Sequence, residues 1–142
     1  MIYTPMTKKA LKLCFESHKE QLDKSGMPYV FHPFHLAEQM TDENTTVVAL
    51  LHDVVEDTDY TFEDLAQMGF SAEIIEALRL MTHNDETPYM EYVARLKHNP
   101  ITRAVKLADL AHNSDLTRLE TVDERALKRA EKYAAAIRLL NE

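Results

Sequence analysis

Apolar residues recur at intervals of three and four along almost the whole chain, which is the spacing of amphipathic α-helices. Segment 45–57 shows this clearly, because Val47, Val48, Leu51, Val54 and Val55 fall on one helical face. No segment shows the apolar-polar alternation of a half-buried strand. Only two glycines and five prolines occur in 142 residues, so few turns interrupt the pattern. The sequence therefore predicts an all-α fold.

Start and stop signals divide this pattern into separate helices. Thr61 and Ser71 resemble N-caps of two short helices, and Pro100 suits the first turn of a longer one. No repeat, low-complexity segment or change of composition marks a domain boundary. We predict one compact domain over 1–142 with about six to eight helices, which leaves no room for a second catalytic domain. Besides the two short helices, those expected cover 6–24, 33–40, 45–57, 88–98, 100–116 and 123–140.

Charge and cysteine content exclude several classes of protein. The formal net charge of −8 argues against nucleic-acid binding through phosphate contacts. The apolar runs are too short to span a bilayer. Cys14 cannot form an internal disulfide and lies among apolar neighbours, so we expect an inert thiol in a cytoplasmic protein. The oligomeric state stays open.

A cluster of ionisable residues follows the apolar run Val47–Leu51. His52, Asp53, Glu56 and Asp57 would be costly to bury unless a cation compensates the carboxylates. Imidazole and carboxylate together suit Mn²⁺, Fe²⁺ or Zn²⁺. His52 and Asp53 would diverge by about 100° on a regular helix, so their spacing alone does not establish chelation of one ion. Glu56 shares a face with both and is the better candidate for a general base.

Two more segments supply partners for this cluster. His32 stands at a loop-to-helix junction in Val30–Pro33, and Asp109 lies within the apolar helical run 105–113. Asn113 shares a helical face with Asp109. The alternative for the His52 cluster, a solvated polar helix end, loses weight once these two residues are included.

Three segments in register resemble a known family. Ser25–Pro33 (SGMPYVFHP), His52–Thr58 (HDVVEDT) and Lys106–Asn113 (KLADLAHN) are similar to the hydrolase domain of the RelA/SpoT family, within the HD superfamily of metal-dependent phosphohydrolases. The stand-alone small alarmone hydrolases are closest in size. The resemblance covers essentially the whole chain.

This resemblance implies a fold, a metal and a reaction. The fold is an HD-type helical domain, and one Mn²⁺ would be bound by His32, His52, Asp53 and Asp109. The family reaction is hydrolysis of the 3′-pyrophosphate of guanosine tetra- or pentaphosphate. Glu56 and Asp57 would position or activate the attacking water, and Asn113 would shape the nucleotide site.

Further residues are candidates for contacts with the substrate. Lys24 and Lys106 are the cations placed nearest to the motifs, and Ser25 and Tyr29 belong to the first motif. Arg118, Arg125, Lys128, Arg129, Lys132 and Arg138 alternate with acidic residues and are interpreted as an exposed face.

One position departs from the family pattern. The family usually has His-Lys-Gly-Gln-x-Arg-Lys before the Ser-Gly turn, and its arginine packs against the guanine base. Here Glu20 replaces the glycine and Asp23 replaces the arginine. Asp23 favours a second hypothesis, a phosphohydrolase of another nucleotide such as NADPH (at its 2′-phosphate), an adenosine analogue or a nucleoside monophosphate. A third hypothesis is a nucleotide-sensing module without turnover.

Overall fold

The computed structural model describes residues 1–142 and is helical throughout, as the sequence predicts. Its elements are α1 (Pro5–His18), α2 (Phe31–Glu38), α3 (Glu43–Leu51), α4 (Val54–Asp57), α5 (Phe62–Gln67), α6 (Ala72–Met81), α7 (Tyr89–Leu96), α8 (Pro100–Asn113), the 3₁₀ helix η1 (Leu116–Arg118) and α9 (Glu124–Asn141). The only β-type pairing is an isolated bridge between Leu22 and Pro28.

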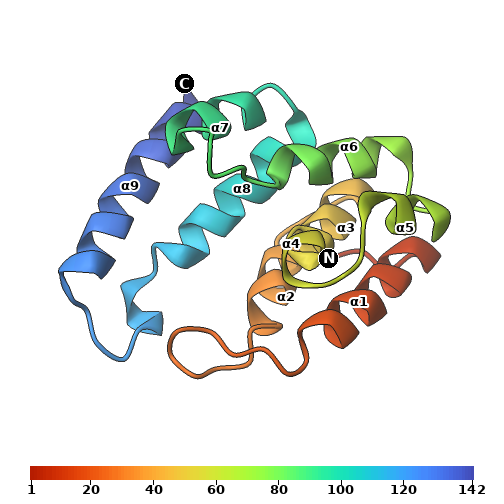
Figure 1. Cartoon of the computed structure of the whole chain (residues 1–142), viewed down its shortest axis with the longest axis horizontal. Helices are drawn as coiled ribbons and strands as arrows, with labels where there is room; N and C mark the ends of the chain where they lie inside the picture. The colour runs from red at the N-terminus through yellow and green to blue at the C-terminus, as the bar shows by residue number, and fades with distance from the viewer.

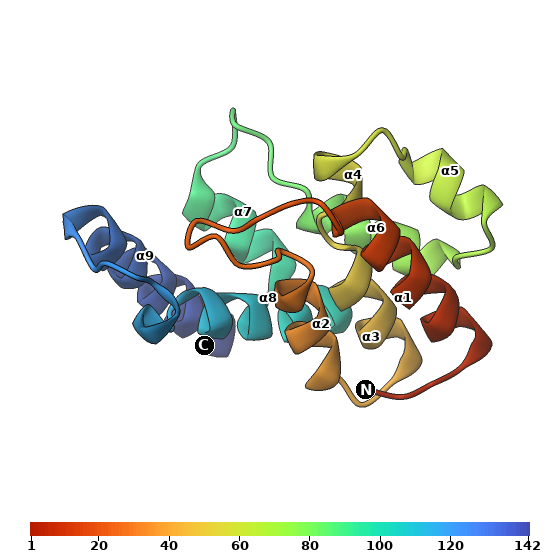
Figure 2. The ribbon, with the colours of Figure 1, turned by 90° about the horizontal axis from the view of Figure 1, so that it is seen from below.

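Helix α3 is the centre of the molecule. It packs against α1, α2, α6 and α8, and its residues 46–51 are completely buried. A helix that is apolar on all sides is stable only when it is surrounded in this way. Helix α9 lies on the other side of α8, packed against α7 and α8, as Figure 1 shows. Figure 2 shows α9 and α1 at opposite ends of the molecule, with α8 and α2 between them.

Local side-chain caps fix where most helices begin. The hydroxyl oxygens of Thr61 and Ser71 accept hydrogen bonds from the Asp64 and Ile74 backbone N–H groups, as expected for N-caps. Asp123 caps α9 in the same manner. Each cap satisfies a backbone donor that the helix itself leaves unpaired.

The helix expected over 100–116 ends at Asn113, and two other expected helices differ more strongly from the structure. The first was expected to reach Lys24, but α1 ends at His18 and residues 19–30 form a loop. Within this loop Gly26 has a φ of 80°, a conformation that glycine adopts without steric cost. The helix expected over 45–57 is interrupted, because α3 ends at Leu51 and α4 starts at Val54. Both departures lie beside the candidate site. No helix is long and apolar enough to cross a membrane.

Candidate metal centre

Three buried side chains from separate parts of the chain converge on one point. His32 lies in the first turn of α2, His52 follows α3, and Asp109 lies in α8. His32 Nε2 lies 2.9 Å from Asp109 Oδ1, and His52 Nε2 lies 3.9 Å from the same oxygen. One donor atom from each of the three residues lies within 4.8 Å of the other two. Such a cluster can hold a divalent metal ion.

The interruption between α3 and α4 brings Asp53 to the same cluster. Asp53 has φ −105° and ψ −1°, so the chain leaves the α-helical path directly after His52. Asp53 Oδ2 lies 3.1 Å from His52 Nε2, although two adjacent residues of a regular helix would point about 100° apart. The irregular backbone therefore places the two side chains together in a way that spacing alone could not predict.

A second layer of side chains orients these donors. The Tyr29 hydroxyl donates a hydrogen bond to Asp53 Oδ2. Lys106 Nζ donates to Asp109 Oδ2 at 2.9 Å, and Asn113 Nδ2 donates to Asp109 Oδ1 at 3.1 Å. Partners of this kind fix the orientation of metal ligands in known sites.

His112 holds the imidazole of His32. The Nδ1 atoms of the two rings are 2.8 Å apart, and the rings are stacked with only 3° between their planes. If Nε2 of His32 binds a cation, its proton is on Nδ1, which then donates to His112. Burial, followed by the charge of Arg118, lowers the pKa of His112 to about 4, so that its ring is a neutral acceptor.

Charges within the cluster compensate one another. Burial by itself would raise the pKa of Asp109, but the Lys106 ammonium group and His32 outweigh it and hold that pKa well below its usual range. Burial would lower the pKa of His52, but the Asp53 carboxylate raises it to about 9. The pKa values of both carboxylates, Asp53 and Asp109, lie below the usual range. Two imidazoles and two carboxylates form a donor set that suits a divalent transition metal.

Glu56 faces the cluster across a small chamber. This chamber has a volume of about 270 Å³. It is lined by the candidate ligands His32, His52, Asp53 and Asp109 together with Tyr29, Glu56, Met81, His83, Tyr89, Tyr92, Lys106 and Asn113. The backbone N–H of His83 donates to Glu56 Oε1 at 3.2 Å. Burial, and then the Asp53 carboxylate, raise the pKa of Glu56. A raised pKa suits a carboxylate that accepts a proton from water.

Asp57 lies apart from this chamber. Its Oδ2 accepts a hydrogen bond from Gln21 Nε2 at 3.3 Å and lies 3.9 Å from Nδ1 of the buried His18. The structure therefore brings Glu56, but not Asp57, to the metal chamber. The role of Asp57 in positioning water stays a prediction.

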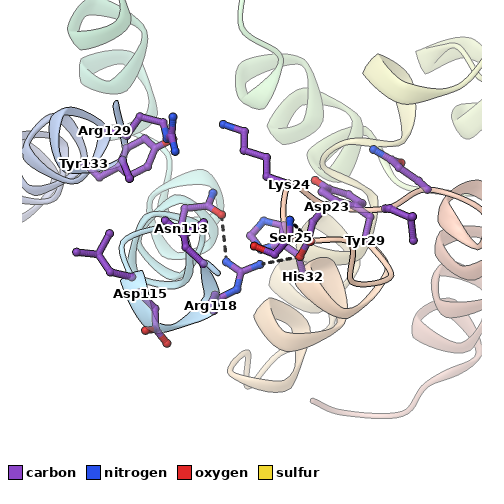
Figure 3. A pocket seen from close by; sticks show the side chains of 15 residues that line it. Asp23, Lys24, Ser25, Tyr29, His32, Asn113, Asp115, Arg118, Arg129 and Tyr133 are labelled. Carbon is purple, nitrogen blue, oxygen red and sulfur yellow. Dashed lines mark hydrogen bonds and ion pairs between the residues drawn. The ribbon is translucent and has the colours of Figure 1, made fainter. Parts of the chain in front are cut away.

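A second, larger chamber adjoins the first. It has a volume of about 370 Å³, and Tyr29, His32 and Asn113 line both chambers. Lys24 and Ser25 line it from the loop between α1 and α2, so that these two predicted residues are placed beside the site (Figure 3). Lys106, by contrast, is in the metal chamber.

Among the residues of this second chamber that the sequence did not indicate are two arginines and a tyrosine. Arg118 is the last residue of η1, and Arg129 and Tyr133 lie in α9. All three side chains line the second chamber. The two arginines were interpreted as part of an exposed face. Helical periodicity shows which residues of a helix share a face, but it does not show that the loop 19–30 lies opposite that face.

Comparison with known proteins places the chain in a family. No profile of a known protein family matches it. The guanosine-3′,5′-bis(diphosphate) 3′-pyrophosphohydrolase MESH1 of Danio rerio is 34% identical over 132 residues, which cover 83% of this chain and 72% of that protein. The chain belongs to the RelA/SpoT hydrolase family.

Other members of the RelA/SpoT hydrolase family show the same relationship. A probable GTP pyrophosphokinase of Mycobacterium leprae (strain TN) is 31% identical over 139 residues, and the match covers 89% of this chain but only 18% of that longer protein. A solved structure, described as a metazoan ortholog of SpoT that hydrolyzes ppGpp, superposes with a TM-score of 0.76 at 25% identity. That match covers 99% of this chain and 88% of the other.

The departure from the RelA/SpoT pattern at Asp23 has a local structural role. Asp23 Oδ1 accepts hydrogen bonds from the backbone N–H groups of Ser25 and Met27, at 2.8 and 3.0 Å. Its Oδ2 lies 3.9 Å from Nη2 of Arg118 (Figure 3). Asp23 therefore holds the turn of the loop and lies beside a guanidinium group that comes from another element.

Proposed function

We propose that this protein hydrolyses guanosine 3′,5′-bis(diphosphate) at the 3′ position, releasing GDP and pyrophosphate, with Mn²⁺ as its metal. The observation that carries the proposal is the convergence of His32, His52 and Asp109 beside Glu56 in one chamber. A water molecule supplies the new P–O bond, the bond from phosphorus to the ribose O3′ breaks, and O3′ takes up a proton. The expected setting is the cytoplasm.

Each role in the proposed reaction is assigned to particular residues of the chain. His32, His52, Asp53 and Asp109 would hold the cation. A bound divalent ion lowers the pKa of water and polarises a phosphoryl oxygen. Glu56 accepts the proton of the attacking water, and its raised pKa brings it closer to the working pH. Lys106 compensates charge beside Asp109, and Asn113 and Tyr29 lie where the two chambers meet.

The test is product analysis with the purified chain and Mn²⁺. The nucleotide panel contains guanosine 3′,5′-bis(diphosphate), its adenosine analogue, NADPH and nucleoside monophosphates. We expect pyrophosphate release from the first compound, and a loss of rate of about 10²–10⁴-fold in Glu56→Gln, as for removal of a general base. Glu63→Gln is the matched control because Glu63 is exposed on α5. Repeating the assay with Mg²⁺ and Zn²⁺ tests the choice of metal.

A second candidate is hydrolysis of another nucleotide at the same metal centre. The observation that favours it is Asp23, which places a carboxylate in the loop beside the second chamber. Glu56-dependent phosphate release confined to NADPH or to a nucleoside monophosphate would support this candidate and refute the first. Tight nucleotide binding without turnover of any compound would instead support a sensing module.

A further inference from the structure

Helix α4 carries Glu56, but it is too short to be stable by itself. It is a single turn (Val54–Asp57), and only Val54 of this turn is buried. A first helical turn fixes several residues for one hydrogen bond, so it persists only where the rest of the molecule holds it. Helix α4 packs against α1 (Figure 2). The contacts between these two helices therefore help to fix the position of the proposed general base.

Three polar side chains join the end of α1 to the end of α4. His18 is the last residue of α1, Gln21 lies in the loop 19–30, and Asp57 is the last residue of α4. His18 Nδ1 lies 2.8 Å from Gln21 Oε1, and Gln21 Nε2 donates to Asp57 Oδ2 at 3.3 Å. The backbone of Gln21 is held as well, because its N–H donates to the His18 carbonyl and its carbonyl accepts from the Tyr29 N–H.

The carboxylate of Asp57 determines the direction of both hydrogen bonds. A carboxylate only accepts hydrogen bonds, so Gln21 turns its NH₂ group to Asp57 and its oxygen to His18. The amide oxygen also only accepts, so the ring proton of His18 is on Nδ1. Nε2 of His18 is then an unprotonated acceptor, and it has no hydrogen-bond partner although it is buried. An apolar side chain would avoid the cost of this unpaired acceptor, so the hydrogen bond from Nδ1 is the feature that needs a histidine here.

His18 is remote from the reacting groups. Its side chain is completely buried and lines neither the metal chamber nor the second chamber. Its ring meets the ring of Tyr29 edge to face, with 5.0 Å between the centroids. Any effect of His18 on catalysis therefore passes through its neighbours Gln21 and Tyr29.

We propose that His18 is a positioning residue. Its Nδ1–H group orients the Gln21 amide, which holds Asp57 and with it the helical turn that carries Glu56. The catalytic consequence rests on the proposed function, whereas the contact itself does not. Because a displaced general base weakens an interaction made in the transition state, loss of His18 should lower kcat more than it raises KM.

Hydrogen–deuterium exchange of the full chain tests the contact without any substrate. The backbone N–H groups of Asp57 and Thr58 donate within α4, so their exchange reports local opening of this turn. In His18→Leu and in Gln21→Leu we expect both amides to exchange about tenfold faster, as for the loss of one hydrogen bond. Gln67→Leu, at an exposed position of α5, is the matched control. Wild-type exchange of these amides in both variants would overturn the proposal.

Two further substitutions separate the hydrogen bond of His18 from the volume of its ring. The amide nitrogen of asparagine is bonded to Cγ, as Nδ1 of histidine is, whereas the glutamine amide reaches further, to the place of Nε2. We expect His18→Asn to keep slow exchange in α4 and His18→Gln to resemble His18→Leu. The amides of α3 are the internal reference, because a general loss of stability would accelerate their exchange too. Equal exchange in His18→Asn and His18→Gln would contradict the role of Nδ1–H.

Kinetics separates this inference from the proposed function. With guanosine 3′,5′-bis(diphosphate) and Mn²⁺, His18→Leu should lower kcat about tenfold and leave KM nearly unchanged, and His18→Asn should restore kcat. Gln21 lines the second chamber, so the kinetic test uses His18 alone. Wild-type kcat in a folded His18→Leu variant would overturn the positioning role. Faster exchange in α4 of a protein that hydrolyses no compound of the panel would support the contact and refute the hydrolase.

Discussion

Lys106 and Asp109, one turn apart on α8, form a buried ion pair with 2.9 Å between Nζ and Oδ2. Lys106 also lies near the rings of Tyr89 and Tyr92, at 5.8 and 5.4 Å from their centroids. Burial would lower the pKa of Lys106, but Asp109 raises it, so that the ammonium form persists in the interior. The charge of this lysine therefore depends on a predicted metal ligand.

Lys106→Met should destabilise the protein, because it leaves Asp109 buried without its cation. In a chelator we expect the unfolding free energy in urea to fall by about 3–5 kcal/mol, the usual cost of removing one partner of a buried pair. In Mn²⁺ the loss should be smaller, because the metal compensates the carboxylate. Lys128→Met, at an exposed position of α9, should change little. An identical loss with and without Mn²⁺ would contradict the assignment of Asp109 as a ligand.

Tyr29→Phe should weaken metal binding. The Tyr29 hydroxyl donates to Asp53, and loss of a partner that orients a ligand typically reduces metal affinity by about 10–100-fold. Calorimetric titration with Mn²⁺, without nucleotide, measures this effect directly. Tyr60→Phe removes a hydroxyl from an exposed ring and serves as the control. Wild-type affinity in Tyr29→Phe would show that Asp53 does not need this contact, or does not bind the metal.

The pH dependence should reflect Glu56. A general base is active as the carboxylate, and the pKa of Glu56 is raised by burial and by Asp53. The rate should therefore fall on acidification at a higher pH than an ordinary glutamate would give. The same shift has the opposite effect on folding: the protonated form is favoured in the folded state, so stability from this group is present at low pH and lost as pH rises through its raised pKa.

Measuring kcat and the free energy of urea unfolding over a series of pH values tests both predicted effects of Glu56. Glu56→Gln should remove most of the activity while making the protein slightly more stable at neutral pH, because it keeps the neutral form. Loss of stability at neutral pH in Glu56→Gln would contradict the sign of this shift.

Cys14 should be unreactive in the folded protein. It is 1% exposed, and burial raises the pKa of its thiol to about 12, so almost no thiolate is present at neutral pH. We expect no modification by a thiol reagent under native conditions and one equivalent of modification in denaturant. Rapid native labelling would indicate that α1 opens, since Cys14 lies on its buried face.

Substitutions of Asp23 should distinguish the hydrogen bonds with which it stabilises the turn from the effect of its negative charge. Asp23→Asn keeps an oxygen that can accept from Ser25 and Met27, so we expect activity and melting temperature close to wild type. Asp23→Ala leaves two backbone donors without this acceptor and should cost roughly 1 kcal/mol of stability, with a higher KM. Steady-state kinetics and thermal melting measure both. If Asn behaves like Ala, the negative charge beside Arg118 matters more than the turn.

Most of the fold could be predicted from local signals. The caps at Thr61 and Ser71 are properties of short segments, and the structure confirms them. Segment 45–51 is helical as predicted, but residues 46–51 are buried on all sides and not on one face alone. The end of α1 at His18 could not be predicted, because residues 19–24 contain no strong helix breaker. The loop there is held by tertiary contacts such as the hydrogen bond from Gln21 to Asp57. Tertiary contacts of this kind override local propensity.

The site could be predicted as a set of motifs but not as a geometry. His32, His52 and Asp109 stood out because ionisable residues in apolar contexts are rare, and the structure brings them together. Asp57 was expected to act on the attacking water together with Glu56, yet its carboxylate lies beside His18 and Gln21 instead. Arg129 gave no signal because an arginine on an amphipathic helix resembles any solvated residue until the opposite wall is known.

The interruption of the helix between Leu51 and Val54 has a consequence for the design of metal sites. Transplanting a His-Asp dipeptide onto an uninterrupted designed helix would send the two side chains in different directions, and the engineered scaffold would bind metal poorly. A successful graft has to reproduce the two-residue kink at His52 and Asp53 together with the tyrosine that anchors the aspartate. A graft must therefore carry over the backbone conformation together with the two side chains. A library of designed proteins that varies only the residue types on straight helices would not include this conformation.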